Sequence, residues 1–210
     1  MNSNELESYK QTLKLTKRQR EIIVGTILGD GHLETSNNGR TYRLKTEHAL
    51  SQKAYVDWLY AELKDWVRTK PQIKEQLVNN KMFSKYWFNT YAHGSLRFYG
   101  QQFYKQKKKI VPKLIYKWLT PLSLAVWFMD DGSIKSKVHK ARIINTQSFT
   151  KAEVELLIKT LQDNFGLQSK LRKQPEGYQI MILAESAEKF AQIIGPYLHD
   201  SMKYKLEGLG

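Results

Sequence analysis

The chain has 210 residues, enough for one large domain or for two domains of about a hundred residues that each bury a core. Apolar residues make up 41% of the chain and cysteine is absent, which excludes a disordered chain, disulfides, thiolate catalysis and cysteine-based zinc sites. The formal net charge of +14 at pH 7 favours a nucleic acid over a membrane surface as the partner.

No stretch approaches the roughly 18 consecutive apolar residues of a membrane helix. The first residues lack the features of a secretion signal and of an organelle transit peptide. We therefore expect a protein that has no membrane partner, is not secreted, and works in the cytoplasm or within the organelle that encodes it.

The sequence of the first half predicts seven elements in order. A helix over residues 16–29 has Thr16 as its cap, carries an apolar face and ends at Gly29-Asp30-Gly31. Strands over residues 32–35 and 40–47 follow, then a helix that Ser51 opens and that carries apolar positions as far as Trp66. Two further strands, over 72–79 and 85–91, precede helical sequence at about 95–105.

The second half repeats this order. Thr120 caps a helix over residues 120–131 that ends at Asp130-Asp131-Gly132, and strands over 133–137 and 140–147 follow. Thr150 opens the next helix with a capping box to Glu153, and Gly166 ends it. Strands over 168–174 and 178–183 and helical sequence at 186–195 complete the repeat. The matched order predicts a duplication, with a boundary near residues 112–119.

Two aspartates occupy equivalent places in the repeat. An aspartate in the last turn of a helix faces the partial negative charge of the carbonyl end, at a cost of roughly 0.3–1 kcal/mol. One Asp-Gly helix stop is more often a plain turn, but Asp30 and Asp131 lie in register, 101 residues apart. A hard cation that takes carboxylate and carbonyl oxygens would make both positions favourable, so we expect a metal site there.

The segments Ile23-Val24-Gly25-Thr26-Ile27-Leu28-Gly29-Asp30-Gly31 and Leu124-Ala125-Val126-Trp127-Phe128-Met129-Asp130-Asp131-Gly132 resemble the two signature motifs of double-motif LAGLIDADG homing endonucleases. The resemblance spans almost the whole chain, including the segment 145–149 and the ending Tyr204-Lys205-Leu206. It implies an α+β fold of two pseudo-symmetric αββαββα halves, residues 1–115 and 116–210. Their antiparallel sheets would form a DNA-binding saddle, with the motif helices packed at the interface.

The resemblance also implies an activity: a monomer that cuts both strands of a long, asymmetric DNA target and leaves short 3′ overhangs. In the family the last acidic residue of each motif binds metal, and those roles fall on Asp30 and Asp131. The backbone carbonyls of Gly29 and Asp130 are further candidate ligands. Mg²⁺ is the implied metal, with Mn²⁺ as a substitute and Ca²⁺ supporting binding without cleavage.

Four more candidate catalytic residues follow from the resemblance. Lys109 and Lys205 would stabilise the transition state, while Glu47 and Gln147 would order water or support the metal ligands. None of the five histidines shows the spacing of a zinc site or of an HNH nuclease motif, so we expect no histidine to act as a zinc ligand or a general base.

The motifs differ where helices must approach closely. The first motif has Gly25 and Gly29, and the second has Val126 and Asp130 at the matching positions. We therefore expect an asymmetric contact between the motif helices.

The strands are expected to contact DNA. Alternation along residues 40–47 places Leu44 and Thr46 on one face and Arg43 and Lys45 on the other, and a polar face of this kind can contact phosphates and base edges. Two halves with strands of about eight residues would cover about 15–20 base pairs. The first 116 residues hold 21 Lys and Arg against 10 Asp and Glu, compared with 13 against 10 after them, so the first half should make more of the phosphate contacts. The candidate contacts are Arg40, Arg43, Lys45, Lys74, Lys140, Arg142, Lys170 and Arg172.

Two alternatives share this fold. An intron maturase would bind intron RNA and assist splicing, and a DNA-binding regulator would lack cleavage. Charge does not separate them from a nuclease, but both aspartates and both lysines are present, which favours the nuclease.

Overall fold

The computed structural model describes residues 3–136 and 139–209. The chain forms two compact units: Met1–Arg20 with Asp30–Gln101, and Glu21–Gly29 with Gln102–Gly210. Helix α2 (Lys17–Leu28) begins in the first unit and continues into the second. The division into halves 1–115 and 116–210 stays a prediction.

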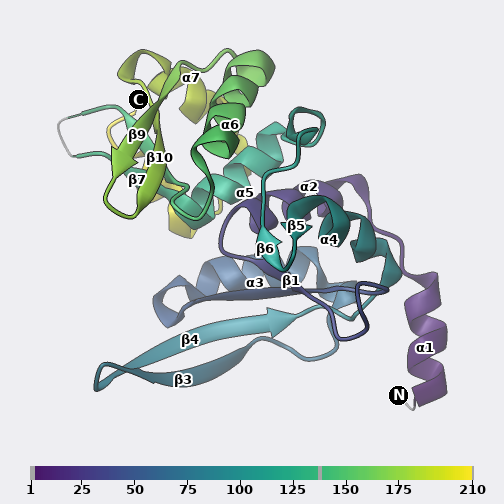
Figure 1. Cartoon of the computed structure of the whole chain (residues 1–210). Helices are drawn as coiled ribbons and strands as arrows, with labels where there is room; N and C mark the ends of the chain where they lie inside the picture. Colours follow the sequence, from purple (N-terminus) through teal and green to yellow (C-terminus); the bar gives the residue numbers. More distant parts are fainter. Residues whose placement is uncertain (1–2, 137–138, 210) are drawn as a thin grey trace. The chain divides into compact units, whose positions relative to one another are not determined.

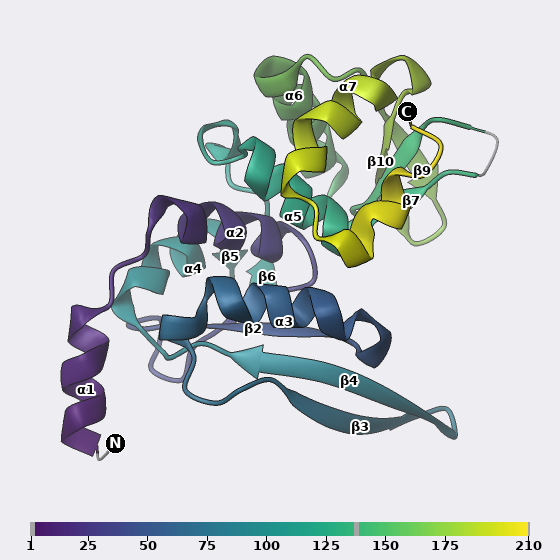
Figure 2. The ribbon, with the colours of Figure 1, turned by 180° about the vertical axis from the view of Figure 1, so that it is seen from behind.

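The first unit contains a four-stranded antiparallel sheet in the order β1-β2-β4-β3 (Figure 1). Its strands are β1 (His32–Glu34), β2 (Arg43–Ala49), β3 (Gln72–Val78) and β4 (Lys81–Asn89). Helix α3 (Lys53–Glu62) runs along one face of this sheet, against β2 and β4 (Figure 2). Helix α1 (Ser3–Thr12) is attached to the unit by the Tyr9 hydroxyl, which donates a hydrogen bond to the Asp65 carbonyl at 2.9 Å.

Strand β2 has one buried face and one polar face. Leu44, Thr46 and His48 are buried on the α3 side, and the His48 ring packs edge-on against Tyr55 of α3. Arg43, Lys45 and Glu47 alternate with them and lie on the other face. The alternation predicted for this strand is therefore confirmed, and the face away from α3 is the open, charged face of the first unit.

The second unit contains a second four-stranded antiparallel sheet, in the order β7-β8-β10-β9. Its strands are β7 (Gly132–Ile134), β8 (Arg142–Asn145), β9 (Ser169–Gln174) and β10 (Gly177–Ile182). Helix α6 (Lys151–Phe165) packs on β9 and β10 (Figure 1), and α7 (Ala184–Ile194) packs on α5 (Pro121–Asp131). A 3₁₀ helix over Asp200–Leu206 follows near the C-terminus.

The predicted helix signals of the second unit are confirmed. Thr120 caps α5, and its hydroxyl accepts a hydrogen bond from the backbone N–H of Ser123. Thr150 and Glu153 form the predicted capping box of α6. Gly166 ends α6 in the left-handed region, with φ of 63°, which glycine adopts without steric cost. These local signals were strong because each satisfies backbone groups that a helix end leaves unpaired.

Several boundaries differ from the prediction. The helix expected from Ser51 is divided into a 3₁₀ turn (Leu50–Gln52), α3 and a second 3₁₀ turn (Lys64–Trp66). The segment 95–105 contains a 3₁₀ turn (Gly94–Leu96), α4 (Arg97–Phe103) and β5 (Tyr104–Lys105). The basic run after α4 forms a hairpin of β5 with β6 (Lys108–Lys109). Short 3₁₀ turns occupy Ile115–Lys117 and Gly195–Tyr197. Residue 137 of the predicted strand 133–137 lies outside the described residues.

In the part of the chain that the structure describes, no helix combines the length and the apolar character needed to cross a membrane.

Candidate functional site

The two motif aspartates each stand at the carbonyl end of a helix. Asp30 lies two residues after the end of α2, and 49% of its side chain is exposed. Asp131 is the last residue of α5 and is partly exposed. The backbone carbonyls at a helix end carry partial negative charge, so both carboxylates are placed where a bound cation would be stabilised twice, by the carbonyls and by the carboxylate.

Close packing joins the α2 motif segment to α5 within the second unit. A Cβ atom at Gly25 would lie 2.7 Å from the Cβ of Val126 and would overlap the carbonyl oxygen of Ser123. A Cβ at Gly29 would overlap the side chain of Asp130. Glycine is therefore needed on the α2 side only, and larger side chains of α5 fill the space. This agrees with the asymmetric contact expected from the sequence.

Two lysines bind the carbonyl ends of the motif helices. The Lys109 ammonium group donates to the carbonyl oxygen of Gly29 at 2.7 Å. Lys205, which is 5% exposed, lies with its Nζ 2.5 Å from the carbonyl oxygen of Met129, 3.3 Å from that of Asp130 and 3.4 Å from that of Phe128. Each lysine predicted from the family pattern thus meets its own motif helix, and each places a positive charge beside the peptide bonds that precede the aspartate.

His48 is a contact of Asp30 that the sequence did not predict. Its side chain is 1% exposed, and its Nδ1 lies 3.4 Å from an oxygen of the Asp30 carboxylate. The ring is fixed by burial on the α3 side of β2 and by the edge contact with Tyr55. The signal in the sequence was the alternation of β2, which puts position 48 on the buried face one residue beyond the predicted strand end.

The two predicted strand-end residues occupy different places. Glu47 is inside β2 and not at its end, because β2 continues to pair with β4 as far as Ala49. Gln147 lies in a turn beyond β8, which ends at Asn145. Asn145, which was not among the predicted site residues, contacts the end of α5 directly. Its side-chain amide donates a hydrogen bond to the backbone carbonyl oxygen of Asp131 at 2.9 Å.

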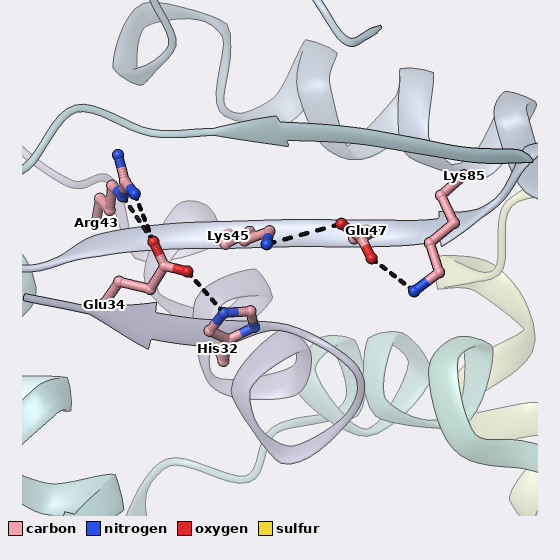
Figure 3. A network of polar contacts seen from close by, with 6 residues as sticks. All are labelled: His32, Glu34, Arg43, Lys45, Glu47 and Lys85. Carbon is pink, nitrogen blue, oxygen red and sulfur yellow. Dashed lines mark hydrogen bonds and ion pairs between the residues drawn. The ribbon is translucent and has the colours of Figure 1, made fainter. Parts of the chain in front are cut away.

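Four of the predicted DNA contacts lie in the first unit. Arg43 and Lys45 are on the open, charged face of the sheet, as are Glu34 and Glu47, which pair with them (Figure 3). Lys74 of β3 is exposed and lies opposite Lys85 of β4, on this same face. Arg40 is exposed in the loop before β2.

The other four predicted contacts lie in the second unit, and Arg142 is a correction. Lys170 and Arg172 are exposed on β9. Lys140 is exposed, and its ammonium group pairs with Glu188 at 2.6 Å. Arg142 is only 1% exposed, in a strand whose first three residues are all buried, so it is not a DNA contact.

Arg142 instead anchors the C-terminal segment. Its guanidinium donates to the carbonyl oxygens of Lys205 at 3.0 Å, Glu207 at 2.6 Å, Lys140 at 2.6 Å and Ala141 at 3.4 Å. Burial lowers the pKa of Arg142 from its ordinary value. The residue therefore holds the backbone of the segment from which Lys205 reaches α5.

Comparisons with known proteins give a consistent result. The model of the LAGLIDADG DNA endonuclease family matches residues 20–190. DNA endonuclease I-ChuI of Chlamydomonas applanata is 31% identical over 92% of this chain and 96% of its own length. The cytochrome b mRNA maturase bI2 of Saccharomyces cerevisiae is 31% identical over 88% of this chain, which spans 46% of that protein. The structure of the homing endonuclease I-WcaI bound to its DNA recognition sequence superposes with a TM-score of 0.93, at 29% identity, over 98% of this chain and 93% of that one.

Proposed function

The chain belongs to the LAGLIDADG DNA endonuclease family, and from this premise we propose that it cuts both strands of a long, asymmetric DNA target at the ends of its two motif helices. The observation that supports this most directly is the matched pair of helix ends. Each presents an aspartate, and each has a lysine ammonium group on its last carbonyls. Because both motifs lie in one chain, we propose that a monomer suffices.

The donor groups at these helix ends suit a hard divalent cation. Asp30 and Asp131 offer carboxylate oxygens, and Gly29 and Asp130 offer carbonyl oxygens, which are the ligands that Mg²⁺ and Ca²⁺ prefer. The carbonyl oxygens of Gly29 and Asp130 each accept a hydrogen bond from a lysine ammonium group, and each has a second lone pair for a metal. We propose that these four residues hold Mg²⁺, with Mn²⁺ as a substitute. When bound, the metal polarises the scissile phosphate and lowers the pKa of a water molecule.

The chain's own residues would then stabilise the transition state and hold the metal-binding aspartates in position. Lys205 and Lys109 carry positive charge next to the reacting strands, where the transition state gains negative charge. Their ammonium groups are preorganised by the helix carbonyls and need no reorganisation during the reaction. His48 restrains the Asp30 carboxylate, and Asn145 fixes the backbone at Asp131. The roles of Glu47 and Gln147 in ordering water stay predictions.

A second candidate function is intron RNA maturation, because a relative of 31% identity carries the name of a maturase. Such a protein would use the basic strands to bind structured RNA and would act in the compartment that contains the intron. We propose the cytoplasm or the organelle that encodes the gene as the place of action for either function.

The decisive experiment compares cleavage with binding. The purified protein is incubated with Mg²⁺ and the duplex formed by joining the exons that flank its intron, and both strands are analysed. We expect breaks in both strands with short 3′ overhangs. Asp30→Asn and Asp131→Asn should each reduce double-strand cleavage at least about a hundredfold, while target affinity in Ca²⁺ stays within about tenfold, because each removes a metal ligand and little DNA surface.

Two outcomes would overturn this proposal. If Asp131→Asn cut both strands at the wild-type rate, the assigned metal ligands would be wrong. If the wild-type protein bound intron RNA tightly and cut no duplex with Mg²⁺ or Mn²⁺, the maturase function would replace the nuclease.

A further inference from the structure

The open, charged face of the first unit carries acidic as well as basic side chains. On β1 and β2 the register places Glu34 directly opposite Arg43, and His32 directly opposite Lys45. Figure 3 shows these side chains with Glu47 and Lys85 along one face of the strands. A carboxylate on a surface that faces DNA repels phosphates, so its presence there calls for a physical reason.

Glu34 holds two basic side chains at once. One carboxylate oxygen accepts a hydrogen bond from Arg43 Nε at 2.8 Å and forms an ion pair with the NH2 nitrogen at 2.7 Å. The other oxygen lies 3.0 Å from Nε2 of His32. All three side chains are partly exposed, at 32% for Glu34, 48% for Arg43 and 43% for His32. The ion pair of Glu34 with Arg43 is thus accessible from solvent, and Glu34 contacts the Arg43 guanidinium from one side only.

The Glu34 carboxylate is charged at neutral pH. Partial burial by itself would raise the pKa of Glu34, but the hydrogen bonds from Arg43 and His32, together with their charges, outweigh burial and lower the pKa below its ordinary value. The ion pair with Arg43 therefore persists at neutral pH.

This contact changes what Arg43 can do. An arginine side chain that no protein group holds can turn to bind the nearest phosphate, and a phosphate contact carries no sequence information. With Nε and one edge of NH2 engaged by Glu34, the remaining N–H groups of Arg43 point in a fixed direction from the strand. A guanidinium held in this way can donate two hydrogen bonds to one base edge, the geometry by which arginine recognises guanine.

We propose that Glu34 is a specificity-determining residue that lowers affinity for non-target DNA and holds Arg43 in position to recognise a base. This inference rests on the proposed DNA-binding function of the open, charged face. It adds a repulsive element to that function: Glu34 disfavours phosphate contacts that any sequence would offer.

The test compares Glu34→Gln with a matched charge change, Glu75→Gln. Glu75 is an exposed acid of the same sheet, on β3, but its carboxylate pairs with Ser84 on the opposite face. Dissociation constants are measured in Ca²⁺ for the target, for targets with single base-pair changes and for an unrelated duplex, at two salt concentrations. Thermal unfolding of each variant verifies that it is folded.

Glu34→Gln should tighten binding to the unrelated duplex by about three- to tenfold and affect the target less, because the loss of one negative charge acts like an added phosphate contact. Discrimination should fall at one or two neighbouring base pairs and not along the whole site. Arg43→Lys, which keeps the charge and loses the planar fork, should reduce discrimination at the same base pairs. Glu75→Gln should leave the ratio of target to unrelated affinity unchanged.

The proposal would be overturned if Glu34→Gln bound target and unrelated DNA more tightly by the same factor and kept its discrimination at every base pair. Glu34 would then act only through its contribution to the net charge. A wild-type protein that binds the target no tighter than the unrelated duplex would instead overturn the proposed function itself. The two failures are therefore distinguished by the wild-type measurement.

Discussion

At the scale of single residues, Lys205 offers the sharpest test of how the second motif helix works. Lys205→Met keeps the length of the side chain and removes the charge from the end of α5. We expect the rate of double-strand cleavage to fall about 100- to 1000-fold with target affinity nearly unchanged, because the loss of one preorganised electrostatic contact costs about this much. Single-turnover cleavage and binding in Ca²⁺ measure the two effects separately.

The control for this change is Lys203→Met. Lys203 is exposed in the same 3₁₀ helix and pairs with Asp200 at 2.6 Å. The Lys203→Met variant should cut both DNA strands at close to the wild-type rate. Wild-type cleavage by Lys205→Met, with both proteins folded, would show that Lys205 only supports the backbone of α5.

Some residues of the candidate site could be predicted from the sequence around them, and others could not. The positions of Asp30, Asp131 and Lys205 at the ends of the motif helices could be predicted from the motifs and their spacing, while their roles stay predictions. His48 could not, because its contact with Asp30 depends on the exact end of β2, and strand ends are set by pairing with β4. Arg142 was wrong as a DNA contact, because a basic residue in a short strand gives no sign of which face is covered.

At the scale of elements, the contact between the α2 motif segment and α5 makes a prediction about Gly25. A methyl group at this position would overlap the Ser123 carbonyl oxygen, which belongs to the backbone and cannot rotate away. Gly25→Ala should therefore lower the free energy of unfolding by about 1–3 kcal/mol, the usual cost of overpacking, despite the higher helix propensity of alanine. Urea unfolding measures it.

Gly195→Ala is the matched change, because a Cβ at Gly195 would meet no atom within 4 Å. It should be neutral or slightly stabilising. Equal stability of both variants would mean that α2 and α5 are not closely packed at Gly25.

The capping box of α6 predicts a dependence on pH. Burial would raise the pKa of Glu153, but hydrogen bonds from the Thr150 side chain and backbone and from the Val111 N–H outweigh it and lower the pKa. A lowered folded-state pKa gives stability that is present above the ordinary value of 4.5 and is lost as the pH falls through the folded-state pKa. The stability difference between wild type and Glu153→Gln should therefore shrink as the pH falls from about 6 to about 3.

Glu176→Gln, in the exposed turn between β9 and β10, should show a much smaller change over the same range. A difference for Glu153→Gln that stays constant with pH would contradict the hydrogen-bonded, ionised carboxylate at this cap.

Elements were predicted well where the local signal was complete. The caps of α5 and α6 and the alternation of β2 are decided by neighbouring residues, and they were confirmed. Helix α1 was not predicted, because its polar sequence shows little apolar periodicity, and its attachment depends on a distant contact of Tyr9 with Asp65. The hairpin of β5 and β6 turns at Gln106 and Lys107, both with positive φ, and neither residue type signals such a turn.

At the scale of the whole molecule, the net charge of +14 predicts a steep dependence of DNA binding on salt. The field attracts any duplex, but only cations that neutralise phosphates release counterions and set the slope. Lys170 and Arg172, exposed on β9, are the predicted phosphate contacts, whereas Lys159 lies on α6 and pairs with Asp163. A charge of the same sign should therefore act differently according to its place in the fold.

Neutralising Lys170 or Arg172 with glutamine should reduce the slope of log K against log salt by about 0.9 for each lost phosphate contact. Where the side chain contacts a base, discrimination at that base pair should fall as well. Lys159→Gln carries the same change in net charge and should leave the slope within error of wild type. Equilibrium binding in Ca²⁺ across a range of salt concentrations measures all three variants. Equal slope changes in Lys170→Gln and Lys159→Gln would show that the total charge, and not the exposed strand, governs the binding of DNA.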